Sequence, residues 1–295
     1  LRDPHGGSNS WSGPWSKDSC EWTKELRKEM PRCEGEDGMF WISFDDFVRY
    51  FASVDVCQIN RKWDSVRLKG EFPQNAQDIC TCFQVRPLQL ATTINITLLQ
   101  KELDSNSPPS RGHQQLRDLG LVLLHAKKHE HVLDSTLTAA SPRRIQSGQN
   151  CEAVLDDLEG SYILVPTSFN NFNRTEHTQC IVDFHSSKPL MIEAVTCPPE
   201  LLGHAVMLQT MKYGKCHKPF PHKDAMRLYE YESQFVVDNG SRSKGFGISL
   251  QVDLNNTDNF ASTRQVLKTS DVVWPNHRQL VCAFSPLRRD VSTAA

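Results

Sequence analysis

An alternation of apolar and polar side chains constrains the fold of this chain more than any other feature. Apolar or β-branched residues occupy every second position from Leu88 to Leu98, with mostly polar residues between them. A period of two is typical of a β-strand with one buried face. Residues 119–126 form a continuous apolar run, which indicates a more deeply buried strand. Further strands are predicted at 162–165 and 180–184, and the lack of long helices between them favours an antiparallel β-sandwich.

The last third of the chain begins differently. Apolar residues keep helical spacing from Leu201 to Met211, and Gly214 suits the end of a helix. From Met226 onward the β pattern returns, at 235–237, 246–254 and 280–284. We therefore expect an α+β domain after a boundary near residue 187.

The first fifty residues are rich in tryptophan. Residues 22–30 are charged and predict a short helix or an ordered loop, while 39–50 interleave aromatic and charged side chains. Periodicity does not decide between strand and helix for 39–50. Residues 105–112 and 135–150 are polar and rich in turn formers, which predicts loops.

Composition excludes several classes of protein. The chain has 295 residues, with 33 basic and 35 acidic side chains and a net charge of −2. This balance gives no electrostatic reason to expect a nucleic acid as partner. No apolar run approaches the roughly 18 residues that a membrane-spanning helix needs. A length near 300 residues predicts about two domains.

The cysteines and histidines give weak signals. Ten scattered cysteines are far too few for a disulfide scaffold, so we expect mostly buried, reduced thiols. Two groups of residues could be considered as zinc ligands: His125 with His129 and His131, and Cys216-His217 with His222. Neither group has the second pair of ligands that is typical of zinc sites. The glycines of Gly245-Phe246-Gly247 lack the rest of a dinucleotide loop and suggest a bulge or close backbone approach. Glycosylation sequons begin at Asn95, Asn173, Asn239 and Asn255.

The N-terminal motifs resemble the end of the calpain protease core. Leu1-Arg2-Asp3-Pro4-His5-Gly6 is followed by Trp11-Ser12-Gly13-Pro14-Trp15-Ser16 and by Trp22. The calpain family carries Arg-Asn-Pro-Trp-Gly, then Trp-x-Gly-x-Trp-Ser-Asp, then Trp. Gly38-Met39-Phe40-Trp41, with Asp46-Phe47, is similar to the family's Gly-x-Phe-Trp-x-x-x-x-Asp-Phe segment.

The resemblance extends over nearly the whole chain. Residues 160–169, Gly-Ser-Tyr-Ile-Leu-Val-Pro-Thr-Ser-Phe, are similar to a strand of the calpain sandwich, and 180–184 fit its last strand. Residues 262–264 and 277–280 resemble the C-terminal domain of small-optic-lobes calpains. The resemblance implies a mainly β (α+β) protein in three parts. These are the end of a papain-like calpain protease core (1–55), an antiparallel β-sandwich (56–187) and an α+β C-terminal domain (188–295).

Calpains are cysteine endopeptidases in which a histidine deprotonates the nucleophilic thiol and an asparagine orients that histidine. The resemblance places the cysteine and the histidine upstream of Leu1, so only the third position lies here. It is Asp3 rather than Asn; a carboxylate still accepts the imidazole N–H bond and favours the charged imidazolium. His5 replaces the tryptophan that shields this hydrogen bond from water in the family. The chain alone is expected to be inactive.

The resemblance also implies a calcium half-site. The corresponding positions are Ser10, Lys17, Asp37 and Met39, with a backbone carbonyl near Gly35. Ca²⁺ prefers six to eight oxygen ligands, and only Asp37 supplies a carboxylate. We expect weak calcium binding here, or none.

The resemblance makes the parent protein a cytoplasmic enzyme that cuts protein substrates. Its expected partners are the upstream half of the catalytic core and an unidentified protein that binds the C-terminal domain. One alternative is a catalytically inactive, calpain-derived scaffold, favoured by Asp3, His5 and Lys17. Another is an unrelated secreted β-protein that uses the sequons.

Overall fold

A computed structural model describes residues 11–30, 39–51, 54, 60–73, 80–100, 116–129, 131–170, 178–218, 225–251, 260–264 and 268–286. The chain forms two compact units, one made of Leu1–Ile59 with Val291–Ala295 and the other of Asn60–Asp290.

The first unit contains two short helices, α1 (Leu26–Glu29) and α2 (Phe44–Tyr50). Helix α2 begins with Ser43 as its N-cap: the Ser43 hydroxyl accepts a hydrogen bond from the Asp46 amide at 3.0 Å and donates one to the Asp46 carboxylate at 2.7 Å. The ambiguous segment 39–50 is thus helical in its second half, because Ser43 satisfies the first turn.

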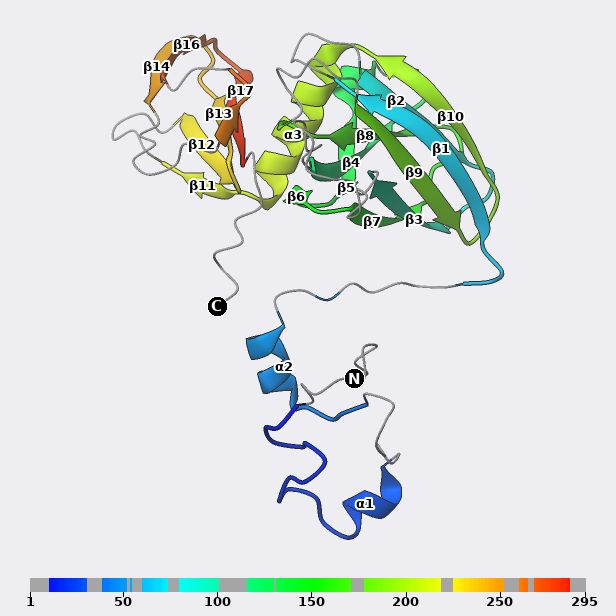
Figure 1. Ribbon diagram of the computed structural model, residues 1–295. Helices are drawn as coiled ribbons and strands as arrows, with labels where there is room; N and C mark the ends of the chain where they lie inside the picture. Colours follow the sequence, from blue (N-terminus) through cyan, green and yellow to red (C-terminus); the bar gives the residue numbers. More distant parts are fainter. Residues whose placement is uncertain are drawn as a thin grey trace, which may run out of the picture. The chain divides into compact units, whose positions relative to one another are not determined.

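The second unit contains a β-sandwich of two antiparallel sheets (Figure 1). The outer sheet has the order β1 (Asp64–Phe72), β9 (Thr178–Ser186), β3 (Thr92–Leu99) and β7 (Gly148–Leu155). The inner sheet has the order β10 (Leu190–Cys197), β2 (Cys80–Pro87), β8 (Ser161–Thr167), β4 (Asp118–Ala126) and β5 (Thr136–Ala140), and β6 (Arg144–Ile145) pairs with β4. A short 3₁₀ helix, η2 (Val132–Asp134), precedes β5.

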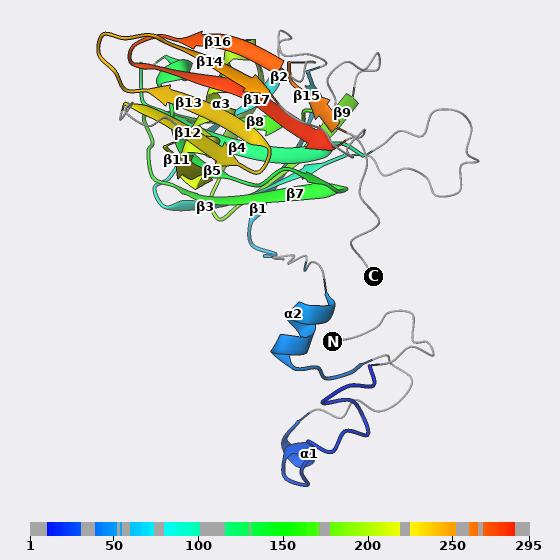
Figure 2. The ribbon, with the colours of Figure 1, turned by 90° about the vertical axis from the view of Figure 1, so that its left-hand side faces the viewer.

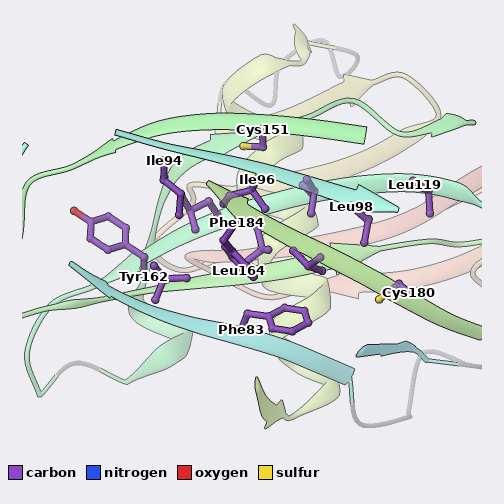
Figure 3. Close-up of a cluster of buried hydrophobic side chains, with 14 of the residues drawn as sticks. Phe83, Ile94, Ile96, Leu98, Leu119, Cys151, Tyr162, Leu164, Cys180 and Phe184 are labelled. Carbon is purple, nitrogen blue, oxygen red and sulfur yellow. The ribbon is translucent and has the colours of Figure 1, made fainter. Parts of the chain in front are cut away.

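The central strands β4 and β8 of the inner sheet are buried on both faces, which explains their long apolar runs. Along β4, Leu119, Leu121 and Leu123 face the core between the two sheets, whereas Val122 and Leu124 face a second core. Strand β8 divides its side chains in the same way. Figure 3 shows the first core, in which Phe83 and Phe184 meet edge to face at 5.7 Å.

The second core lies under helix α3 (Pro199–Tyr213). The helix starts with a proline in its first turn and ends at Gly214, as the sequence predicts. Leu201, Ala205 and Val206 are fully buried in this core.

The remaining strands form two further sheets (Figure 2), and the larger of them packs against α3 through β12, β13 and β17. One has the order β11 (Lys215–His217), β12 (Met226–Tyr231), β13 (Gln234–Asn239), β17 (His277–Pro286) and β15 (Phe260–Ser262), and the other pairs β14 (Phe246–Gln251) with β16 (Lys268–Val273). A small third core joins them through Val237, Val273 and Val281. None of the helices in the described ranges is long and apolar enough to cross a membrane.

The structure confirms a mainly β fold with antiparallel pairing and one long helix before the last strands. The division at residues 55 and 187 stays a prediction. Two expectations are wrong in detail. Residues 88–91 form a turn in which Ala91 has φ 52°, so the predicted strand begins only at Thr92. The predicted loop 135–150 contains β5, β6 and the start of β7.

Candidate functional site

The three residues predicted for catalysis and calcium binding cannot be placed. Asp3, His5 and Asp37 lie outside the described residues. Their proposed roles stay predictions.

An aromatic cluster organises the N-terminal segment. The Trp15 and Trp22 rings meet edge to face at 5.2 Å, and Trp22 meets Trp41 at 6.4 Å. The Trp22 indole N–H donates to the Ser16 carbonyl oxygen at 2.8 Å. These contacts tie the segment that follows Asp3 to the segment that follows Asp37.

Helix α2 has an apolar surface that the described residues of the first unit leave open. Phe44 and Val48 are 76% and 61% exposed, and the helix buries none of its side chains. Phe44 and Val48 are four residues apart and therefore lie on one side of the helix. A large exposed apolar surface of this kind is typical of an interface.

Two of the predicted calcium positions can be examined. Lys17 is exposed, and Met39 is 44% exposed. An ammonium group and a thioether offer no oxygen to Ca²⁺. These two positions therefore do not fit a calcium site.

The predicted histidine cluster does not form a metal site. The His125 imidazole Nε2 lies 2.8 Å from the Asp157 carboxylate, and its ring lies 4.8 Å from the Tyr162 ring. His131 instead accepts a hydrogen bond from the Leu133 amide at the start of η2. Within the described ranges, no group of three potential ligands could hold a metal ion.

The Cys216-His217 group lies only partly within the described residues. The His217 imidazole lies 2.9 Å from the Glu230 carboxylate on the neighbouring strand. His222, the third residue of that group, lies outside the described residues.

The Asp157 carboxylate closes the turn after β7. The backbone N–H of Gly160 lies 3.0 Å from this carboxylate and that of Glu159 2.9 Å, and both donate to it. Hydrogen bonds from Gly160, His125 and Glu159 hold the pKa of Asp157 below its ordinary value. A histidine and an aspartate in contact resemble part of a catalytic triad. No described cysteine or serine is hydrogen-bonded to this imidazole. The role of the His125–Asp157 pair is therefore to stabilise the turn after β7.

The thiols behave mostly as core side chains. Six described cysteines are buried, and only Cys20 and Cys216 are exposed. Burial raises the pKa of Cys151, Cys180 and Cys282 to about 12. Such thiols are poor nucleophiles at neutral pH.

A buried charged network was not apparent from the sequence. The Asp118 carboxylate, at the start of β4, accepts hydrogen bonds from the Ser168 hydroxyl and from the amides of Phe169 and Asn170, each at 2.9 Å. The Arg143 guanidinium donates to its other oxygen at 2.5 Å and stacks over the Phe169 ring at 4.2 Å. Gly120 permits this arrangement, because a Cβ there would lie 2.5 Å from the Arg143 side chain.

The same arginine joins the sandwich to the C-terminal strands. Its guanidinium donates to the Phe284 carbonyl oxygen on β17 at 3.1 Å, and its amide donates to the Glu232 carboxylate at 3.3 Å. Gln209 on α3 adds a bond to the Ser141 carbonyl oxygen at 2.8 Å. The network is structural: it fixes the two halves of the second unit against each other.

Comparison with known families explains both ends of the chain. Residues 1–58 match the model of the calpain family cysteine protease, and residues 209–294 match that of the calpain-D-like C-terminal domain. Both ends are calpain-like. These matches support the resemblance to calpains that the sequence motifs indicate.

Individual calpains show modest identity. The chain is 35% identical to mouse calpain-5 over 199 residues, which are 57% of this chain and 30% of calpain-5. It is 26% identical to the calpain-type cysteine protease DEK1 of Arabidopsis thaliana over 193 residues, 58% of this chain and 9% of DEK1. Calpain-A of Drosophila melanogaster is 33% identical over 88 residues, 24% of this chain and 11% of calpain-A. The chain thus spans less than a third of the length of each of these relatives.

One sequon can be assessed directly. The Asn239 side chain is fully buried, and its amide nitrogen lies 2.9–3.0 Å from the carbonyl oxygens of Lys244, Val273 and Trp274. Its amide nitrogen is therefore not available for a glycan in the folded protein. This argues against the interpretation as a glycosylated protein at that position.

Proposed function

We propose that this chain is the C-terminal part of a small-optic-lobes-type calpain, a cytoplasmic cysteine endopeptidase that makes limited cuts in protein substrates. The nucleophilic cysteine and the base histidine would come from the half of the core that precedes Leu1. Asp3 would accept the imidazole N–H bond and so hold the histidine toward the cysteine. The histidine would take the thiol proton and deliver it to the leaving amine.

The observation that carries this proposal is the apolar surface of α2 that the described residues of the first unit leave open. Phe44 and Val48 are exposed within a segment that matches a protease domain over 1–58. Covering a phenylalanine and a valine would each contribute about 1.5–3 kcal/mol. We propose that the upstream half of the core covers this surface.

We expect calcium, on which enzymes of this type depend, to bind weakly or not at all in this half of the core. Lys17 and Met39 supply no oxygen ligand, and Asp37 alone would hold Ca²⁺ weakly. Calorimetry of this chain with calcium chloride should therefore show no tight binding. Tight binding that Asp37→Ala removes would contradict this part of the proposal.

The proposal is tested on the intact parent protein and on this chain alone. The parent should cleave casein, and an epoxide that alkylates catalytic thiols should abolish the activity. This chain alone should leave casein intact. A parent that neither cleaves casein nor reacts with the epoxide would overturn the proposal.

The second candidate is a non-catalytic scaffold. Asp3 in place of asparagine, His5 in place of tryptophan and Lys17 at a calcium position all favour it. An upstream sequence without a nucleophilic cysteine and a base histidine would support the scaffold over the enzyme.

A further inference from the structure

An exposed apolar strip crosses the outer face of the β14–β16 ribbon. It consists of Gly245, Gly247, Val272 and Trp274 and is called the Trp274 strip below. Trp274 is 63% exposed and Val272 is 52% exposed. The alternate residues Phe246, Ile248 and Val273 pack into the core of this region, so the strip lies on the opposite face of the same strands.

Glycines leave the strip open. A Cβ at Gly245 would lie 3.6 Å from the Trp274 ring and 3.8 Å from Val272. A Cβ at Gly247 would meet nothing within 4 Å, although Gly247 lies directly opposite Val272 in the strand pair. No side chain therefore fills the space next to Trp274 and Val272, and the backbone of another chain can approach closely there.

The strip is held rigidly from beneath. The buried Asn239 side chain binds the carbonyl oxygens of Val273 and Trp274 on one side and of Lys244 on the other. The Asn276 amide donates to the Ser241 carbonyl oxygen at 3.0 Å, which ties the two adjoining turns together. Preorganisation of this kind lowers the entropic cost of binding.

The adjoining turn carries positive charge. Arg242 and Lys244 are exposed, and neither forms an ion pair with another described residue. The acidic groups nearby are engaged elsewhere: Asp238 with Arg278 at 3.3 Å and Asp271 with Arg264 at 2.8 Å. An apolar strip thus lies beside two cations that lack carboxylate partners among the described residues.

We propose that the Trp274 strip docks an extended acidic peptide segment with a proline or aromatic anchor. The anchor would pack on Trp274 across Gly245 and Gly247, while acidic residues of the peptide would face Arg242 and Lys244. Two cations on a chain of net charge −2 are few for a nucleic-acid partner. The proposal does not depend on whether the parent is a peptidase.

The test starts with a phage library of random twelve-residue peptides panned on the full 295-residue chain. Enriched peptides are synthesised with a fluorescent label, and their affinity is measured by anisotropy. Trp274→Ala should weaken binding about tenfold or more. Arg242→Ser combined with Lys244→Ser should weaken it and reduce its dependence on salt.

Two variants separate binding from folding. Gly247→Gln adds a side chain into open space on a strand, so it should preserve the fold and still block binding. Tyr213→Ala, an exposed aromatic on α3, is the control and should leave affinity unchanged. Enrichment of acidic peptides that lose binding with Trp274→Ala and Gly247→Gln would support the proposal. The proposal would be overturned if no peptides were enriched, or if the enriched peptides were not acidic. It would also be overturned if both variants left binding unchanged, or if an oligonucleotide bound in preference to the peptides.

Discussion

The Asp118 carboxylate and the Arg143 guanidinium lie 2.5 Å apart in the interior of the second unit, with side chains only 3% and 5% exposed. Three donors to Asp118 and the Phe284 carbonyl oxygen, which accepts from Arg143, offset part of the cost of burying this ion pair. The Arg143 Nε has no hydrogen-bond partner among the described residues. The pair connects β4, the loop after β5 and β17.

Removing Arg143 should strongly destabilise the second unit. Arg143→Met leaves the Asp118 charge buried without its partner, and we expect a loss of about 3–5 kcal/mol in the free energy of unfolding. Urea denaturation measures this loss. Arg144→Met is the matched control. The Arg144 side chain, which pairs with Glu232, is 56% exposed, so this substitution should lower the free energy of unfolding by less than about 1 kcal/mol. Equal costs for the two variants would show that the buried network does not hold the unit together.

Asp157 should make stability depend on acid pH. Its folded-state pKa is lowered, so the charged carboxylate contributes stability above its ordinary pKa, and this contribution is lost as the pH falls through the folded pKa. Asp157→Asn should therefore lower the free energy of unfolding at pH 7 and have a progressively smaller effect below about pH 4.

Denaturation of both proteins across this pH range tests the effect, with Glu152→Gln on β7 as a control for the loss of one negative charge. A destabilisation by Asp157→Asn that grew on acidification would contradict the assignment.

Thiol reactivity should separate exposed from buried cysteines. At pH 8 a thiol with a pKa of about 12 is thiolate in about one molecule in 10⁴, so Cys151, Cys180 and Cys282 should resist iodoacetamide in the folded protein. Cys20 and Cys216 should be alkylated first. Peptide mass spectrometry after brief labelling, with and without urea, measures the order. Early labelling of Cys151 in the absence of urea would be inconsistent with its burial.

The apolar surface of α2 should contribute to stability only in the intact parent protein, where the upstream half of the protease core is present. Phe44 is 76% exposed, so Phe44→Ser should change the stability of this chain by no more than about 0.5 kcal/mol. In the intact parent the same change should cost about 1.5–3 kcal/mol, because the side chain would be covered there. Thermal denaturation of both proteins provides the comparison, with Leu90→Ser, in an exposed turn, as control. The same small cost in both proteins would argue against a covered α2.

Local patterns predicted the elements whose burial follows a simple period. Helix α3 has one buried side between a proline and a glycine, and β4 has apolar residues on both faces, so each could be recognised without its neighbours. Strand β1 could not, because most of its side chains are exposed and its sequence lacks an apolar period. Its position depends on pairing with β9, more than a hundred residues later in the chain.

The buried network was missed for a related reason. Asp118 and Arg143 are distant in sequence, and each resembles an ordinary polar residue at the edge of an apolar or turn segment. Only the fold brings them together with Phe284. The Leu88–Leu98 pattern shows the opposite error, since Leu88 and Leu90 continue the alternation but lie 55% exposed in a turn. For Asp3, His5 and Asp37, the sequence resemblance remains the sole basis for a role.

The most direct test of the proposed function is casein cleavage by the intact parent protein, measured across pH for wild type, Asp3→Asn and Asp3→Ala. The account predicts an active wild type and an active Asp3→Asn variant with a shifted pH profile, because both side chains accept the imidazole N–H bond. Asp3→Ala should lower kcat/KM by about 10²- to 10⁴-fold. Undiminished cleavage by Asp3→Ala, or no cleavage by any of the three proteins, would contradict it.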